Sequence, residues 1–142
     1  MSEECVFCRI LAGQLPASFV LRGERVAAFM DIQPVNPGHV LVIPLRHAAS
    51  LAELDADDAA EMMRAARRVA AALRESGLRC EGVNLFLADG EAAGQEVFHA
   101  HLHVFPRWSR DGFGLRFGPD YRTLPPRAAL DDAAEAIRGA IK

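Results

Sequence analysis

The segment Phe98-His99-Ala100-His101-Leu102-His103-Val104-Phe105 is the part of the chain that decides the fold. Histidines alternate with apolar residues, and a strand turns successive side chains to opposite faces. We therefore predict a strand over Val97–Phe105, with its three histidines on one face and about 6.6–7 Å apart. The opposite face would be apolar and pack against a helix; it comprises Ala100, Leu102 and Val104.

A row of histidines on one strand face is typical of a functional site rather than of core packing. Imidazole titrates near neutral pH and serves as base, nucleophile or metal ligand. A neutral imidazole with one free nitrogen can attack phosphorus and form a covalent phosphoramidate. The alternative is a catalytic zinc ion held by the imidazoles. On an unbent strand the three histidines would span about 13 Å, which is too far for one ion.

The rest of the sequence predicts an α+β fold with a largely antiparallel sheet, a main helix packed on one face and a C-terminal helix. Apolar stretches predict strands over 18–22, 25–32, 39–45 and 82–88, and the first two would form a hairpin joined by Gly23-Glu24. A helical turn is expected over 5–12 and a final helix over 130–141. The main helix would begin near 55–58 and stop at Gly77. Its buried face would comprise Ala59, Met62, Met63, Ala66, Val69, Ala70 and Leu73.

Composition limits the class of protein and its partners. A chain of 142 residues, about half apolar, predicts a single globular domain over residues 1–142. The net charge of -3 argues against a nucleic-acid polymer as partner. No apolar run approaches the roughly 20 residues that span a bilayer, so no membrane partner is expected. The acidic start Met1-Ser2-Glu3-Glu4 is unlike a signal peptide, and we predict a cytoplasmic protein.

The three cysteines are too few for a disulfide framework. Cys5 and Cys8 form a C-x-x-C pair, which in a reducing compartment indicates metal or redox chemistry. A thioredoxin-like pair would follow a strand, and none is predicted before Cys5. Without a metal, both would be small buried apolar residues. Cys80 stands alone and is interpreted as structural or incidental.

The histidine row resembles the H-φ-H-φ-H-φ-φ signature of the histidine triad (HIT) family of nucleotide hydrolases and transferases. The similarity is to the bacterial type with a zinc-binding cysteine pair. It covers roughly residues 5–107 and leaves 108–142 as a C-terminal extension. The other segments that carry it are Cys5–Ile10, Phe29–Ile32, Pro37–Pro44, Asp89-Gly90 and Ala93–Gln95.

This resemblance implies a catalytic role for three histidines. His101 would take the nucleotidyl group as nucleophile, His103 would contact the α-phosphate, and His39 would orient the triad. Gln95 would also contact the α-phosphate, backbone N–H groups of 95–97 would hold the anion, and Asp31 would accept hydrogen bonds from the ribose hydroxyls. The slot for the base would be formed by Phe7, Ile10, Leu15, Phe29 and Ile32.

The implied reaction is cleavage at the α-phosphate of a nucleoside phosphoramidate or dinucleoside polyphosphate. It would pass through a nucleotidyl-histidine and release a nucleoside monophosphate, with a purine nucleotide as the expected ligand. The proposed chemistry requires no magnesium. Two alternatives remain: a non-catalytic nucleotide-binding regulatory module, and a zinc hydrolase that uses the triad as ligands.

The resemblance also implies a structural zinc ion and a homodimer. The zinc ligands would be Cys5, Cys8, His47 and His99, a closed Cys₂His₂ set. The opposing interpretation makes His47 a surface residue.

Two positions depart from one branch of the family. Glu96 stands where that branch has serine, and Ala88 where it often has asparagine. If that serine protonates the leaving group, Glu96 leaves the leaving-group preference open. A carboxylate there would also disfavour highly charged polyphosphates.

Overall fold

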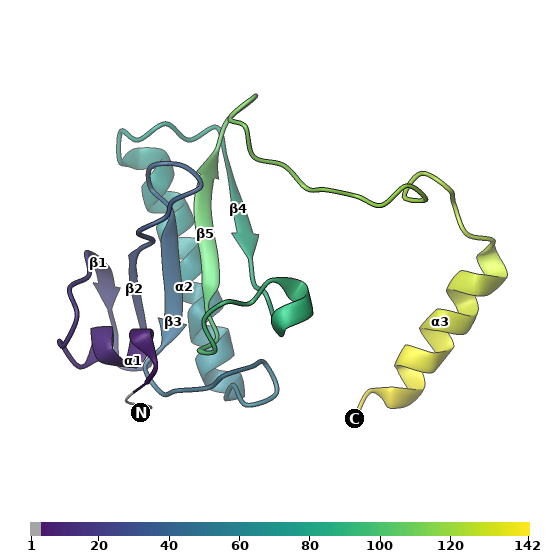
Figure 1. The fold of residues 1–142 in the computed structure, drawn as a ribbon, viewed down its shortest axis with the longest axis horizontal. Helices are drawn as coiled ribbons and strands as arrows, with labels where there is room; N and C mark the ends of the chain where they lie inside the picture. Colours follow the sequence, from purple (N-terminus) through teal and green to yellow (C-terminus); the bar gives the residue numbers. More distant parts are fainter. Residues whose placement is uncertain (1–3) are drawn as a thin grey trace. The chain divides into compact units, whose positions relative to one another are not determined.

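The structure is a computed structural model that describes residues 4–142, and its centre is a five-stranded antiparallel sheet (Figure 1). The strand order is β1-β2-β3-β5-β4, and each neighbouring pair is antiparallel. The strands are β1 (Phe19–Arg22), β2 (Val26–Met30), β3 (Val40–Pro44), β4 (Gly82–Phe86) and β5 (Leu102–Arg107). The helices are α1 (Val6–Leu11), α2 (Ala56–Glu75) and α3 (Arg127–Ala140), with a short 3₁₀ turn, η1 (Glu91–Ala93). The predicted α+β class with an antiparallel sheet is confirmed.

Each face of the sheet packs against a different helix. Successive side chains of a strand point to opposite faces, so alternate residues of one strand belong to two different clusters. Val40, Val42, Leu102 and Val104 belong to the core cluster beneath α2. Phe29, Leu41 and Ile43 belong to a second cluster, which also contains Phe7 and Ile10 of α1. His103 lies between Leu102 and Val104 in β5, so its side chain is on the face away from α2.

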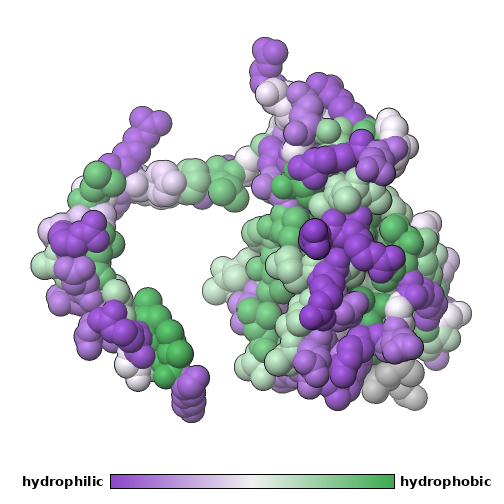
Figure 2. All heavy atoms as spheres, turned by 180° about the vertical axis from the view of Figure 1, so that it is seen from behind, coloured by the Kyte–Doolittle hydropathy of each residue, from purple (hydrophilic) through white to green (hydrophobic). Residues whose placement is uncertain are grey.

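The main helix is amphipathic, but its buried face is slightly rotated from the prediction. Ala65 is buried, whereas Ala59 and Met63 are exposed and Ala70 is half-buried. The prediction was therefore wrong at Ala59 and Met63. Figure 2, the view from behind, shows hydrophilic side chains across the face of the sheet domain on which α2 lies, with hydrophobic side chains on either side of them.

The hairpin between β1 and β2 is confirmed, with its turn shifted by one residue. The Gly23 N–H donates to the Val26 carbonyl at 2.8 Å, so Glu24 and Arg25 are the two connecting residues. Gly23 is not among the glycines with positive φ. Gly23 therefore flanks the turn instead of opening it.

The predicted strand over 97–105 is wrong in its first half. Residues 97–99 bend, and β5 begins only at Leu102. The Ala100 N–H donates to the Ala48 carbonyl at 2.7 Å, so the backbone pairs here with the loop after β3 instead of with a neighbouring strand. His99 and His101 consequently precede the strand, and only His103 lies within it.

A glycine turn delivers His39 to the start of β3. Gly38 has φ +104°, and a Cβ there would lie 3.0–3.2 Å from atoms of Leu73, Leu78 and Pro106. Only glycine avoids both the strained backbone and this close approach. The backbone of the turn therefore packs directly against side chains of α2 and β5.

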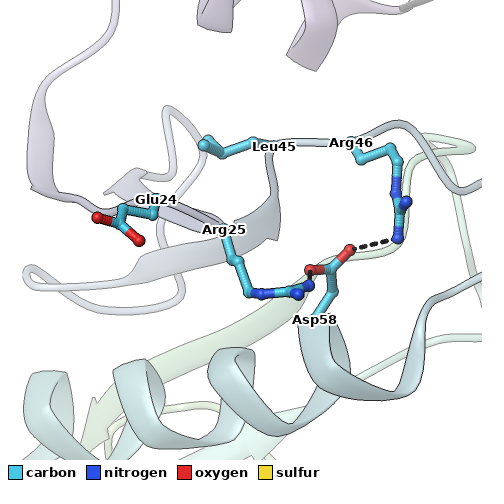
Figure 3. Close-up of a pocket in the computed structure, with 5 residues that line it drawn as sticks. All are labelled: Glu24, Arg25, Leu45, Arg46 and Asp58. Atoms are coloured by element: carbon cyan, nitrogen blue, oxygen red, sulfur yellow. Dashed lines mark hydrogen bonds and ion pairs between the residues drawn. The ribbon is translucent and has the colours of Figure 1, made fainter.

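The N-terminus of α2 is fastened to the sheet by buried charge. Asp55 caps the helix by accepting from the N–H groups of Asp57 and Asp58. Asp58 is buried and accepts from Arg25 at 2.6 Å and from Arg46 at 3.2 Å. Figure 3 shows its carboxylate between the two arginines, in a cavity of about 380 Å³ lined also by Glu24 and Leu45.

The chain divides into two compact units, Met1–Gly112 and Phe113–Lys142. The second unit contains α3, which begins three residues earlier than predicted, and stacked rings of Phe117 and Tyr121 with centroids 3.8 Å apart. Across residues 4–142, no helix combines the length and the apolar character needed to cross a membrane.

Replacing Asp58 with alanine should lower the free energy of unfolding by about 1–3 kcal/mol, because two arginines lose a buried acceptor. Urea denaturation of the purified protein measures this change. Asp57→Ala is the matched control, since the Asp57 side chain is 81% exposed and lies 3.7 Å from Arg25. An equal effect of both substitutions would contradict this interpretation of the α2 N-terminus.

Candidate functional site

The four residues expected to bind zinc come together in the first unit. Cys5 is the N-cap of α1, Cys8 lies in that helix, His47 follows β3, and His99 lies at the bend before β5. The His99 Nδ1 atom is 3.5 Å from Cys5 Sγ and 3.6 Å from Cys8 Sγ. Cys8 Sγ is 3.4 Å from His47 Nδ1, and the four ligand atoms lie within 4.8 Å of one another.

These distances fit a tetrahedral zinc ion. Bonds of about 2.3 Å to sulfur and 2.0–2.1 Å to nitrogen place such ligand atoms roughly 3.5–3.6 Å apart. The far side of His99 also fits, because its Nε2–H donates to the Pro44 carbonyl at 2.8 Å and leaves Nδ1 as a lone pair. Burial lowers the pKa of His99 to about 4, which keeps it a neutral ligand. Burial raises the pKa of the Cys5 thiol, so its thiolate needs a nearby cation.

His101 is held with one nitrogen available for chemistry. Its Nδ1 lies 2.7 Å from the His99 carbonyl oxygen. A carbonyl only accepts, so Nδ1 carries a proton, and in the neutral imidazole Nε2 then carries the lone pair. The ring meets Phe7 edge-on at 5.2 Å and lies 4.9 Å from the His103 ring, measured between centroids.

Asp31, His39 and His103 form a second group of polar side chains. His39 Nε2 lies 2.9 Å from His103 Nδ1 and 3.5 Å from Asp31 Oδ2. Burial lowers the pKa of His103 to about 4; the proximity of two further imidazoles, His101 and His39, lowers it as well, and the Asp31 carboxylate opposes the shift. Burial likewise lowers the pKa of His39. Both imidazoles are therefore neutral near pH 7.

The side chain of Gln95 stabilises the loop before the histidines through three hydrogen bonds to backbone groups. Its Oε1 accepts from the Gly90 N–H at 2.8 Å, and its Nε2 donates to the carbonyls of Ala49 and Val97 at 2.7 and 3.1 Å. Both amide hydrogens are thus engaged, and a contact from this amide to a phosphate would require one bond to break. In the described part of the chain, the backbone N–H groups of Glu96 and Val97 form no hydrogen bond.

The structure does not gather all five residues expected to contact the base. Phe7, Ile10 and Phe29 are core residues, each at most 9% exposed, and Leu15 lies at the edge of their cluster. Ile32 is 94% exposed and outside that cluster. Glu96 is exposed on the loop.

Sequence reasoning missed the groups that orient the imidazoles. The carbonyls of Pro44 and His99 and the N–H of Val35, which donates to His39 Nδ1 at 3.0 Å, belong to the backbone. Residue type carries no signal for them. Asn36 is buried and polar, and its place in a proline-glycine loop gave no indication of its contacts.

The five-stranded antiparallel sheet of this chain brings a histidine cluster beside a Cys₂His₂ set. Residues 12–110 match the family model described as the HIT domain. The chain belongs to the HIT family.

Solved structures agree with this assignment. A HIT family protein from Bacillus anthracis is 34% identical, with a TM-score of 0.89 and full coverage of both chains. A zinc-bound histidine triad family protein from Mycobacterium smegmatis is 42% identical, with a TM-score of 0.75 and coverage of 94% of this chain and 97% of that one. A histidine triad nucleotide-binding protein from Candida albicans is 26% identical, with a TM-score of 0.84 and 96% coverage of each chain. Family membership supports a nucleotide hydrolase, transferase or nucleotide-binding role, and the Cys₂His₂ cluster suggests zinc.

Protein purified without a histidine tag should contain about one zinc ion per chain, measured by elemental analysis. Cys8→Ser should remove the metal and lower the thermal midpoint by at least roughly 5 °C, because metal binding contributes to folding. Cys80→Ser is the matched control, since Cys80 lies outside the Cys₂His₂ cluster, at the edge of the α2 core, and its Sγ donates to the Gly82 carbonyl at 3.3 Å. A zinc-free, fully stable wild type would contradict this prediction.

Proposed function

We propose that the chain is a nucleotidyl hydrolase or transferase that attacks a nucleoside α-phosphate with His101. The observation that carries this proposal is the 2.7 Å contact from His101 Nδ1 to the His99 carbonyl, which leaves the Nε2 lone pair as nucleophile. His101 is also buried among aromatic rings, where water competes less for that lone pair.

The chemistry has two steps. His101 Nε2 bonds to the α-phosphorus, and the bond to the amine or phosphate leaving group breaks with protonation of that group. Water then attacks the phosphorus, the N–P bond breaks, and a nucleoside monophosphate leaves. An imidazole intermediate divides one difficult displacement into two easier ones.

Neighbouring groups fit the phosphate and the ribose. His103 is neutral and partly exposed, so it suits a hydrogen bond to a phosphate oxygen. The N–H groups of Glu96 and Val97 offer a backbone anion site. One oxygen of Asp31 accepts from the Gln33 N–H at 2.8 Å, and the carboxylate can also accept from ribose hydroxyls. The printed description of the Candida albicans neighbour as nucleotide-binding supports this assignment.

Zinc has a structural role in this proposal. Cys5, Cys8, His47 and His99 fill four tetrahedral positions and leave none open for a substrate. The bound ion would fix His99, whose carbonyl orients His101. A zinc hydrolase that uses all three triad histidines fits poorly, because His99 groups with the cysteines and His103 with Asp31.

The substrate class is a purine nucleoside phosphoramidate or dinucleoside polyphosphate, hydrolysed without magnesium by a cytoplasmic homodimer. The competing function is a nucleotide-binding regulatory module without turnover. Both functions would use the same residues around His101, so turnover separates them.

His101→Ala should reduce kcat/KM by at least about 10³-fold on an adenosine phosphoramidate and change the nucleoside monophosphate Kd by only a few-fold. Steady-state kinetics and calorimetry on the zinc-loaded protein measure the two effects. Quenching wild type during turnover with an alkaline denaturant should also trap a nucleotidyl adduct on His101, because the N–P bond of such an adduct is stable to base and labile to acid. Absence of turnover on phosphoramidates, dinucleoside polyphosphates and nucleotidyl sulfates would favour the binding module.

Glu96→Ser should shift preference toward dinucleoside polyphosphates, because it removes a carboxylate from an exposed loop position near a charged leaving group. The ratio of kcat/KM for the dinucleotide and the phosphoramidate should rise several-fold. Glu91→Ser, which removes an exposed carboxylate from the same loop, is the control. An unchanged ratio would remove Glu96 from the specificity determinants.

A further inference from the structure

The two cysteines of the Cys₂His₂ cluster differ in their access to solvent. Cys8 is buried, with 2% of its surface exposed, whereas Cys5, the N-cap of α1, is only half-buried. The reactivity of a cysteine depends on its exposure as well as on its thiolate character. Of the two, Cys5 is therefore the cysteine that a small reagent in solution can reach, and Cys8 is protected behind it.

The two sulfur atoms are close enough to join. The ligand atoms of the cluster lie within 4.8 Å of one another, so the two sulfurs are no farther apart than this. The Cys8 N–H donates to Cys5 Sγ at 3.5 Å, which shows that the Cys5 side chain already folds over the first turn of α1. A disulfide needs sulfur atoms about 2.05 Å apart. Because Cys5 precedes the helix with an extended backbone, rotation of its side chain can close this gap without breaking up α1.

We propose that Cys5 and Cys8 form a site of reversible oxidation, at which a hydroperoxide converts the two thiolates to a disulfide, releases zinc and lowers the activity of His101. The release of zinc rests on the zinc site proposed above, and the loss of activity rests on the proposed role of His101. The disulfide itself requires only the two sulfurs.

The oxidation takes two balanced steps. Zinc, when bound, keeps both sulfurs as thiolates at neutral pH. The Cys5 thiolate attacks the hydroperoxide: an S–O bond forms, the O–O bond breaks, and the products are a sulfenic acid and an alcohol, or water where the oxidant is hydrogen peroxide. The Cys8 thiolate then attacks Cys5 Sγ, so that the S–S bond forms, the S–O bond breaks and hydroxide leaves as water. Two sulfurs are oxidised, one peroxide is reduced, and two protons come from solvent.

A disulfide at this position dismantles the metal site. It removes two of the four ligands and leaves His47 and His99 alone, whereas structural zinc takes four protein ligands. It also removes the two negative charges that offset the charge of the cation. Formation of the disulfide and loss of the metal are therefore one event.

The consequence for His101 follows from the burial of His99. The His99 Nε2–H donates to the Pro44 carbonyl, so its Nδ1 lone pair faces the cysteine sulfurs. A disulfide has no proton to donate, and a buried acceptor without a partner is costly. The His99 ring therefore shifts on oxidation. Its own carbonyl, which lies 2.7 Å from His101 Nδ1, shifts with it, and the bond that leaves the His101 Nε2 lone pair free is weakened.

Treatment of the zinc-loaded protein with a few equivalents of hydrogen peroxide tests the chemistry. Peptide mass mapping should find a Cys5–Cys8 disulfide as the main product. A chromogenic chelator should report about one zinc ion released per disulfide. A thiol reductant followed by zinc should restore the zinc-loaded protein. Sulfinic or sulfonic acid at Cys5 as the main product, or release of zinc without the disulfide, would overturn the proposal.

Two variants separate the cysteine pair from a general effect of peroxide. Cys5→Asp keeps an acceptor at the N-cap and an oxygen ligand for zinc but cannot form the disulfide. It should retain its zinc under conditions that empty the wild type, and equal losses of zinc would contradict the proposal. Cys80→Ser removes the third cysteine and should lose zinc at the wild-type rate; a slower loss would assign the oxidation to Cys80 instead. If Cys5→Asp does not take up zinc, the mass mapping of wild type decides.

Two-bond ¹H–¹⁵N correlation spectra report the effect on His101 without turnover. Reduced, zinc-loaded protein should show His101 protonated at Nδ1, and oxidised protein should show a mixture of tautomers. An unchanged tautomer after oxidation would overturn the link between the cysteines and His101. On an adenosine phosphoramidate, kcat should fall by at least about 10-fold on oxidation and return with reductant and zinc, since a small misplacement of a catalytic group is enough for such a loss. Protein that is inactive in both states, yet forms the disulfide and releases zinc, would reject the proposed function and leave the oxidation site standing.

Discussion

The site depends on His99, whose polar groups act in three directions. Its Nδ1 faces the two cysteine sulfurs, its Nε2 donates to the Pro44 carbonyl, and its own carbonyl accepts from His101. The ring is fully buried, so none of these bonds competes with water. A change in the Cys₂His₂ cluster that moves His99 would therefore also move the carbonyl that orients the imidazole of His101. The Cys₂His₂ cluster and the His101 imidazole are therefore connected through a single residue, His99.

The strand pattern and the helix could be predicted because burial enforces periodicity. Val40 and Val42 pack under α2, while Leu41 and Ile43 pack toward α1, as alternation requires. The same alternation failed at residues 97–101, where the pattern continues but the backbone bends to pair with Ala48. Side-chain polarity reports which face is buried, whereas hydrogen-bond partners distant in sequence determine where a strand starts.

The candidate site was predictable in its residue types and not in its bonding. The motif and its resemblance identified Cys5, Cys8 and all five histidines. The structure gathers all of these except His101 into two clusters, and the His101 ring lies 4.9 Å from that of His103. It could not reveal that the Gln95 amide is consumed by Ala49 and Val97, or that Ile32 is exposed. The bonds that orient the rings come from backbone groups, whose positions depend on the finished fold.

Two buried histidines of the same chain illustrate how position determines chemistry. Burial lowers the pKa of both His99 and His39, so both are neutral imidazoles with one proton to place. At His99 the far nitrogen meets a carbonyl, which pulls the proton away from the cysteines and leaves a lone pair for a metal. At His39 the far nitrogen meets an amide N–H, which pushes the proton toward His103. One backbone group, accepting in the first case and donating in the second, therefore determines which ring nitrogen of each neutral histidine carries the proton.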